Sequence, residues 1–94
     1  SESVLVQNDF ALFQNNPNPF DKETVIAFHL PESMPAKLTI YDITGKVIKL
    51  MEVSGNKGMN EVTIAKGQIP TSGVVYYQLD AKDFTATKRM IIIE

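Results

Sequence analysis

Short runs of alternating apolar and polar residues, separated by turn-forming residues, make up most of this 94-residue chain. In the run TVIAFHL, Ile26, Phe28 and Leu30 fall on one side of an extended strand, and Pro31 ends the run. A period of two residues is typical of strands that bury one face, whereas the 3.6-residue period of a helix is almost nowhere to be found. The pattern predicts an all-β fold.

The same alternation recurs, so that about seven strands with turn signals every 8 to 12 residues predict an Ig-like antiparallel β-sandwich. In the turn ITGK, Gly45 supplies positive φ and Asp42 can hydrogen-bond to the turn amides, which predicts a hairpin. The other expected strands are a short one at Phe10 to Phe13, AKLTIYDI (36–43), VIKLMEV (47–53), MNEVTIA (59–65), VVYYQLDA (74–81) and a last one from about Phe84 to Ile93.

Length and composition limit the classes of protein to which this chain can belong. The chain is long enough for one domain, and its lack of cysteine excludes disulfides and thiolate metal sites. A net charge of −2, with the cations spread along the chain, argues against nucleic-acid binding. The apolar runs are far shorter than the about 20 residues that span a bilayer, and the N-terminus does not resemble a signal peptide. An exported domain of this kind would need a signal elsewhere in a longer precursor.

Side chains for catalysis or cofactor binding are sparse. His29 is the only histidine, and its place in an apolar strand favours a structural role over acid–base chemistry. The carboxylates Asp21 and Glu23, and likewise Asp80 and Asp83, lack the loop spacing of a calcium site. We therefore expect no enzyme activity, no cofactor and no metal.

The neighbouring Tyr76 and Tyr77 lie in one strand, where alternation predicts one ring in the core and one on the surface. Packing is the favoured role for both rings, and a carbohydrate-binding platform is the alternative.

The stretch NNPNPF precedes the strand TVIAFHL. Pro17 and Pro19 fix φ, lack an N–H and bias Asn16 and Asn18 toward extended geometry. The segment is expected to be a stiff lead-in that delivers Phe20 to one end of the sandwich, while the asparagine side chains satisfy loose backbone groups.

Several blocks together point to one family. FALFQNNPNPFDKET (10–24), LTIYDITGKVI (38–48), IPTSGVVYYQL (69–79) and FTATKRMIII (84–93) stand in the order and spacing of the type A C-terminal sorting domain of the type IX secretion system. The chain resembles this family over residues 10–94, and it stops just after an apolar strand, as family members do at the end of their precursors. Residues 1–9 match no block and are expected to be a linker to an upstream cargo.

The resemblance implies a sorting role in bacteria of the Bacteroidetes group and their relatives. Such a domain folds in the periplasm, is recognised by the outer-membrane translocation machinery and is usually removed by a sortase-like peptidase. The cargo is then released or attached to the cell surface. A processing site is expected in or before residues 1–9.

Residues that match the family's motifs are expected to define the fold or to take part in recognition. The last strand is the best candidate for recognition by the translocation machinery, in particular Lys88, Arg89, Met90 and Ile91; alternatively, Lys88 and Arg89 only keep the apolar strand from aggregating. The motif residues are Pro17, Asn18, Pro19, Phe20, Tyr41, Asp42, Gly45, Lys46, Gly73 and Tyr77.

Two rival functions are also compatible with the sequence. A fibronectin-like or Ig-like module that binds polysaccharide or a partner protein would show an exposed aromatic patch on a sheet face. An accessory domain that stabilises an adjoining enzyme would, when isolated, expose a large apolar surface to solvent. Exposed edge strands also make weak self-association an expectation.

Overall fold

The computed structural model describes residues 10–94 and consists of strands and one short 3₁₀ turn. The expected linker over residues 1–9 lies outside the described residues. The elements are β1 (Ala11–Leu12), β2 (Glu23–Leu30), β3 (Met34–Tyr41), β4 (Val47–Gly55), β5 (Gly58–Ala65), η2 (Lys66–Gln68), β6 (Gly73–Ala81) and β7 (Phe84–Ile92).

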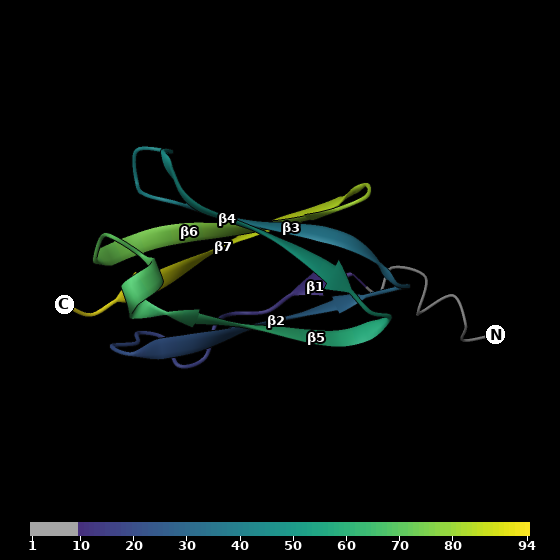
Figure 1. Ribbon diagram of the computed structural model, residues 1–94, viewed down its shortest axis with the longest axis horizontal. Helices are drawn as coiled ribbons and strands as arrows, with labels where there is room; N and C mark the ends of the chain where they lie inside the picture. The colour runs from purple at the N-terminus through teal and green to yellow at the C-terminus, as the bar shows by residue number, and fades with distance from the viewer. Residues whose placement is uncertain (1–9) are drawn as a thin grey trace.

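The strands form two layers (Figure 1). One sheet has the strand order β1-β2-β5 and the other the order β4-β3-β6-β7, and all pairings between these strands are antiparallel. This arrangement confirms the predicted Ig-like sandwich.

The core lies between the sheets and is made by alternate residues of facing strands. Ile26, Phe28 and Leu30 of β2 are fully buried, as the alternation predicted. Val75, Tyr77 and Leu79 of β6 are fully buried against them, and the buried residues form one cluster. Each large apolar side chain taken out of water contributes about 1.5–3 kcal/mol. With no disulfide, this cluster carries the fold.

The β3–β4 connection has the predicted hairpin chemistry. The Asp42 Oδ1 atom accepts hydrogen bonds from the backbone N–H of Thr44 at 2.9 Å and of Lys46 at 3.0 Å. Gly45 has a φ of 90°. Because a glycine lacks Cβ, it takes this conformation without steric cost.

Strand β3 begins at Met34, two positions before the expected start, and includes Pro35. Pro35 pairs with Ser54 of β4, and the pairing of β3 with β6 begins only at Lys37. A proline at this end of the strand is tolerated, because the sheet does not continue on its other side.

The chain changes sheet between β4 and β5. Gly55 is buried at the end of β4. A Cβ atom on Gly55 would clash with the Leu30 side chain and would lie 3.0 Å from the carbonyl oxygen of Met34. The crossing therefore depends on the close approach that a glycine permits.

The N-terminal part of the chain also changes sheet. β1 pairs with β2, and the isolated bridge between Asn16 and Val25 extends this pairing. Phe20 then forms a parallel bridge with Ile92 of β7, in the other sheet. We call residues 13–20 the edge segment, because they run from one sheet to the outer edge of the other.

Candidate functional site

The edge segment covers the outer edge of the terminal strand β7. The backbone N–H of Phe20 donates to the carbonyl oxygen of Ile91 at 3.1 Å, and the N–H of Ile93 donates to the carbonyl oxygen of Phe20 at 2.9 Å. Just before these bonds along β7, the N–H of Ile91 donates to the Asn18 Oδ1 atom at 2.9 Å. The last residues of β7 are therefore paired on both sides, although β7 is the outermost named strand of its sheet.

The same two stretches of chain stay together toward the other end of the sandwich. The Gln14 Nε2 atom donates to the carbonyl oxygen of Arg89 at 2.6 Å. The rings of Phe10 and Phe84 are stacked, with centroids 5.1 Å apart and an angle of 12° between their planes. Residues 10–20 thus accompany β7 from its first residue to its last.

A buried polar cluster holds the edge segment in place. The Tyr77 hydroxyl donates to the carbonyl oxygen of Phe13 at 2.8 Å and accepts from the N–H of Asn15 at 2.9 Å. The Asn15 Nδ2 atom donates to the Thr24 Oγ1 atom at 3.0 Å, and the Thr24 hydroxyl donates to the carbonyl oxygen of Pro17 at 2.7 Å.

Every buried side-chain polar atom in residues 10–94 has a hydrogen-bond partner, so the cluster introduces no uncompensated desolvation. Burial raises the pKa of Tyr77 to about 12. The phenol is therefore a neutral group that links β6 to the edge segment.

The first motif block and Tyr77 of the third block meet in the structure. Pro17 and Pro19 are exposed and follow cis peptide bonds, and Phe20 is only 2% exposed. Asn18 satisfies a backbone N–H, which is the role that the sequence predicted for these asparagines.

Sequence reasoning missed Gln14 and Thr24, and it missed the bonds of Asn15 with Tyr77 and Thr24. The sequence separations of these pairs, such as the 75 residues between Gln14 and Arg89, match no local period. The adjoining asparagines of NNPNPF were the available signal, because a buried asparagine requires partners.

The candidate recognition residues on β7 divide between its two faces. Met90 is completely buried in the core. Lys88 lies opposite Tyr77 on the core-facing side and is half-buried. Arg89 and Ile91 point to the outer face, where Arg89 is exposed and Ile91 is half-buried. In the folded domain, Arg89 is the most accessible side chain of this set.

The motif residue Tyr41 also lies on the outer face of the four-stranded sheet, directly opposite Tyr76 of β6. The Tyr41 hydroxyl donates a hydrogen bond to the Gln78 Oε1 atom. Partial burial, and next the negative charge of Asp80, raise the pKa of Tyr41. Tyr76 is 36% exposed, so the predicted division of Tyr76 and Tyr77 between surface and core is confirmed.

The remaining motif residues lie at turns. Asp42, Gly45 and Lys46 form the exposed β3–β4 hairpin. The pKa of Asp42 is lowered, mainly because the Thr44 hydroxyl donates a hydrogen bond to its carboxylate. Gly73 begins β6 opposite Ile92 and has a φ of 90°. Asp42, Gly45 and Lys46 make the contacts of a turn, whereas Gly73 pairs with the residue of β7 that forms the bridge with Phe20.

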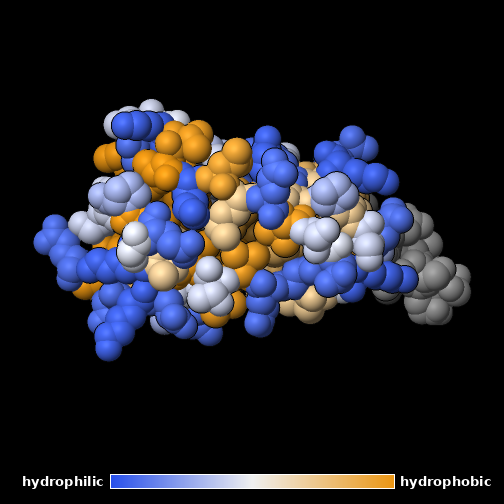
Figure 2. Space-filling view, in the orientation of Figure 1, coloured by the Kyte–Doolittle hydropathy of each residue, from blue (hydrophilic) through white to orange (hydrophobic). Residues whose placement is uncertain are grey.

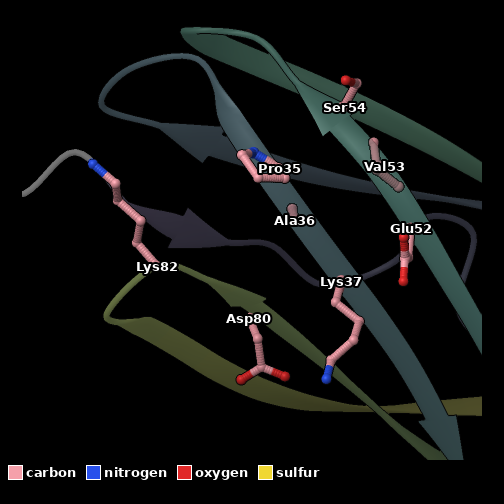
Figure 3. A pocket seen from close by; sticks show the side chains of 8 residues that line it. All are labelled: Pro35, Ala36, Lys37, Glu52, Val53, Ser54, Asp80 and Lys82. Atoms are coloured by element: carbon pink, nitrogen blue, oxygen red, sulfur yellow. The ribbon is translucent and has the colours of Figure 1, made fainter.

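A shallow groove with a volume of about 580 Å³ lies on the four-stranded sheet, at the end away from the β3–β4 hairpin (Figure 3). Across the strands, Lys37 of β3 stands between Glu52 of β4 and Asp80 of β6, so that opposite charges alternate. The groove is lined by Pro35, Ala36, Lys37, Glu52, Val53, Ser54, Asp80 and Lys82.

Residues 10–94 hold no group of three or more His, Cys, Asp or Glu side chains that could ligate a metal ion. His29 is half-buried on β2, opposite Met59. Within the described part of the chain, no helix has the length and apolar character needed to cross a membrane.

Comparison with known proteins identifies the family. The sequence profile described as "Secretion system C-terminal sorting domain" matches residues 16–93, which include most of the edge segment and all of β7. No curated protein sequence matches the chain. Among solved structures, the sensor domain of the anti-sigma factor RsgI4 from Pseudobacteroides cellulosolvens is similar, with a TM-score of 0.54 and 7% sequence identity.

That similarity covers 93% of this chain and 99% of the sensor domain. At so low an identity it supports the fold alone. The family match, in contrast, extends over most of the chain and contains the motif residues that the structure brings together around β7. The chain therefore belongs to the family of secretion system C-terminal sorting domains, which are sorting signals of the type IX secretion system.

Proposed function

We propose that this domain is the sorting signal that directs an upstream cargo protein in the same precursor across the outer membrane through the type IX translocation machinery. The cargo passes through the periplasm and arrives at the cell surface or in the medium. The observation that carries this proposal is the family match over residues 16–93. In this role the domain is bound by the translocation machinery. A rigid surface of packed strands is suited to such binding.

A sortase-like peptidase removes the domain after transport, and the cargo is released or attached to the surface. Residues from Phe10 onward are held by the stack with Phe84 and by the pairing of β1 with β2. A peptidase needs an accessible, extended chain. This requirement supports a processing site N-terminal to Phe10.

Recognition by the translocation machinery uses the outer side of β7. Arg89 supplies an exposed positive charge there and Ile91 adds apolar surface, while Met90 supports them from the core. Lys88 lies at the core-facing side of the strand and offers only its half-exposed side chain. Arg89 is therefore the residue to test first.

The test is secretion of a reporter that carries an N-terminal signal peptide and is fused to residues 1–94, in a host with a working type IX system. An Arg89→Glu variant is compared with a Thr87→Glu variant, because both residues are exposed on the same face of β7. We expect the Thr87→Glu fusion to be exported like the parent and the Arg89→Glu fusion to remain in the periplasm. Equal export of both variants would remove Arg89 from recognition.

Point substitutions are preferable to deletion of residues 84–94. A deletion would remove Met90 and Ile92, which are buried in the core, and would unfold the domain as well as remove its surface. Thermal unfolding of each purified variant must be measured beside export.

A binding module is the second candidate function. The pair of Tyr41 and Tyr76 on the outer sheet face favours it, because aromatic rings on a sheet can support a polysaccharide. Affinity electrophoresis on immobilised polysaccharides, with Tyr76→Ala as the control variant, tests this alternative. Retardation of the parent domain but not of the variant would support it.

A further inference from the structure

The row of residues that contains Arg89 continues across the whole four-stranded sheet. On the outer face, Arg89 of β7 is opposite Tyr76 of β6, Tyr76 is opposite Tyr41 of β3, and Tyr41 is opposite Val47 of β4. We call Val47, Tyr41, Tyr76 and Arg89 the tyrosine row. It joins residues from the middle and the end of the sequence into one band.

Apolar side chains gather around the β4 end of this band. Val47 is 52% exposed and Leu50, in the adjoining row opposite Thr39, is 53% exposed. Ile43, in the preceding turn, is 72% exposed. Figure 2 shows apolar atoms gathered over β4 and the adjacent hairpin. Apolar surface of this kind, collected in one place, marks an interaction site more often than isolated exposed residues do.

The outer face of the other sheet has a different composition. There, β5 presents Glu61 and Thr63 opposite Ala27 and Val25 of β2. Met59 of β5 is 57% exposed on this face, and Phe13, whose backbone N–H donates to the carbonyl oxygen of Ala27, is 43% exposed at its edge. Met59 and Phe13 lie on opposite sides of β2, whereas Ile43, Val47 and Leu50 lie together along β4 and the turn before it.

The tyrosine row carries only positive charge, which belongs to Arg89. Arg89 makes no ion pair in the described part of the chain, where the sole ion pair joins Lys82 and Glu32. At the other end of the face, Lys37 stands between Glu52 and Asp80 and Lys82 lines the same groove, so that two positive and two negative groups lie together there. An unpaired guanidinium beside aromatic rings fits a partner carboxylate, because arginine binds carboxylates with two parallel hydrogen bonds.

We propose that the tyrosine row, together with Leu50, is the docking surface for a protein of the outer-membrane translocation machinery. The partner presents apolar side chains to Val47, Leu50 and Tyr76 and a carboxylate to Arg89. This inference rests on the proposed function and extends the recognition surface from β7 across the sheet to β4. A polysaccharide and the upstream cargo are the competing occupants.

The test uses the 1–94 fusion with the double substitution Tyr76→Thr and Leu50→Thr. Threonine is accepted in strands, so the sheet is preserved while the exposed apolar surface is removed. Met59→Thr is the matched control, because Met59 is 57% exposed on the opposite face. Export is measured in the competent host, and binding of each purified, folded domain to the purified translocation complex is measured by biolayer interferometry.

We expect the double variant to bind at least about tenfold more weakly than the parent, which corresponds to about 1.4 kcal/mol. Its export should fall in parallel, while Met59→Thr changes neither. Arg89→Lys should weaken binding less than Arg89→Glu, because lysine keeps the charge and loses the paired geometry.

Equal binding and export of the double variant and the parent would overturn this inference and leave the proposed function standing. If the parent itself is neither bound nor exported, the proposed function and this inference both fail. Loss of polysaccharide binding or of cargo binding in the double variant, with translocation unchanged, would assign the face to that occupant and would likewise overturn the inference.

Discussion

Asn18 accepts a hydrogen bond from the backbone N–H of Ile91 at 2.9 Å, across a separation of 73 residues. A side chain from the proline-containing stretch thus takes the place of a neighbouring strand at the edge of β7. An uncovered strand edge presents unpaired backbone groups that invite pairing with another chain. The edge segment therefore protects the terminal strand and holds its outer face in a fixed orientation.

Replacing Asn18 by alanine should expose the Ile91 amide. We expect the free energy of unfolding to fall by about 0.5–1.5 kcal/mol, the net contribution of a typical hydrogen bond. The midpoint of thermal unfolding should drop by a few degrees in a domain of this size. Asn16→Ala is the matched control, because Asn16 is exposed, precedes a proline in the same way and pairs through its backbone.

Hydrogen exchange gives the local readout for this pair of variants. In Asn18→Ala, the Ile91 amide should exchange about fivefold faster for each 1 kcal/mol lost. Unchanged exchange at Ile91 would show that Asn18 does not protect the edge of β7.

Tyr77→Phe should loosen the edge segment. The substitution keeps the ring in the core but leaves the N–H of Asn15 and the carbonyl oxygen of Phe13 without the hydroxyl. Since buried groups without partners cost about 1–3 kcal/mol, chemical denaturation should show a loss of that size. Tyr76→Phe, on the surface, should change the free energy of unfolding by less than about 0.5 kcal/mol. Equal losses in both variants would contradict the role of the buried cluster.

Alkaline pH should weaken the domain through Tyr77. Burial raises the pKa of Tyr77 to about 12 in the folded state, whereas the phenol of an unfolded chain titrates near its ordinary value of 10.0. The stabilising contribution is therefore complete below pH 10 and is lost as the pH rises toward 12, by about 1–3 kcal/mol in total. Urea unfolding of the parent and of Tyr77→Phe between pH 9 and about 12 measures the difference. A parallel decline in both proteins would assign the loss to other groups.

Gly55→Ala tests the crossing from β4 to β5. The added methyl group would clash with the Leu30 side chain, so we expect a loss of about 1–3 kcal/mol in the free energy of unfolding, as for other overpacked sites. Gly67→Ala is the control, because nothing lies within 4 Å of a Cβ atom at that position. A Gly55→Ala domain as stable as the control would show that the crossing has room to adjust.

The β-sandwich could be predicted from the sequence because alternation is a local signal. Ile26, Phe28 and Leu30 mark a buried face by their spacing alone, and Asp42 with Gly45 marks a hairpin by its turn chemistry. The resemblance added the family, which the match over residues 16–93 confirmed.

The site could be predicted only in part, because its geometry depends on which strands become neighbours. No local pattern indicates that Tyr77 bonds to Phe13, or that Arg89 shares a row with Tyr76 and Tyr41. Alternation does place Met90 in the core and Arg89 on the surface. The sequence prediction treated Lys88, Arg89, Met90 and Ile91 as one group, although the strand separates them onto two faces.

The central claim is that this domain is sufficient to direct a protein from the periplasm through the type IX system. The most direct measurement is the location of a reporter that carries an N-terminal signal peptide and is fused to residues 1–94, in a competent host and in the same host without the translocation machinery. We predict that the reporter reaches the surface or medium only in the competent host and remains in the periplasm of the other. Retention in both hosts, or release from both, would contradict the claim.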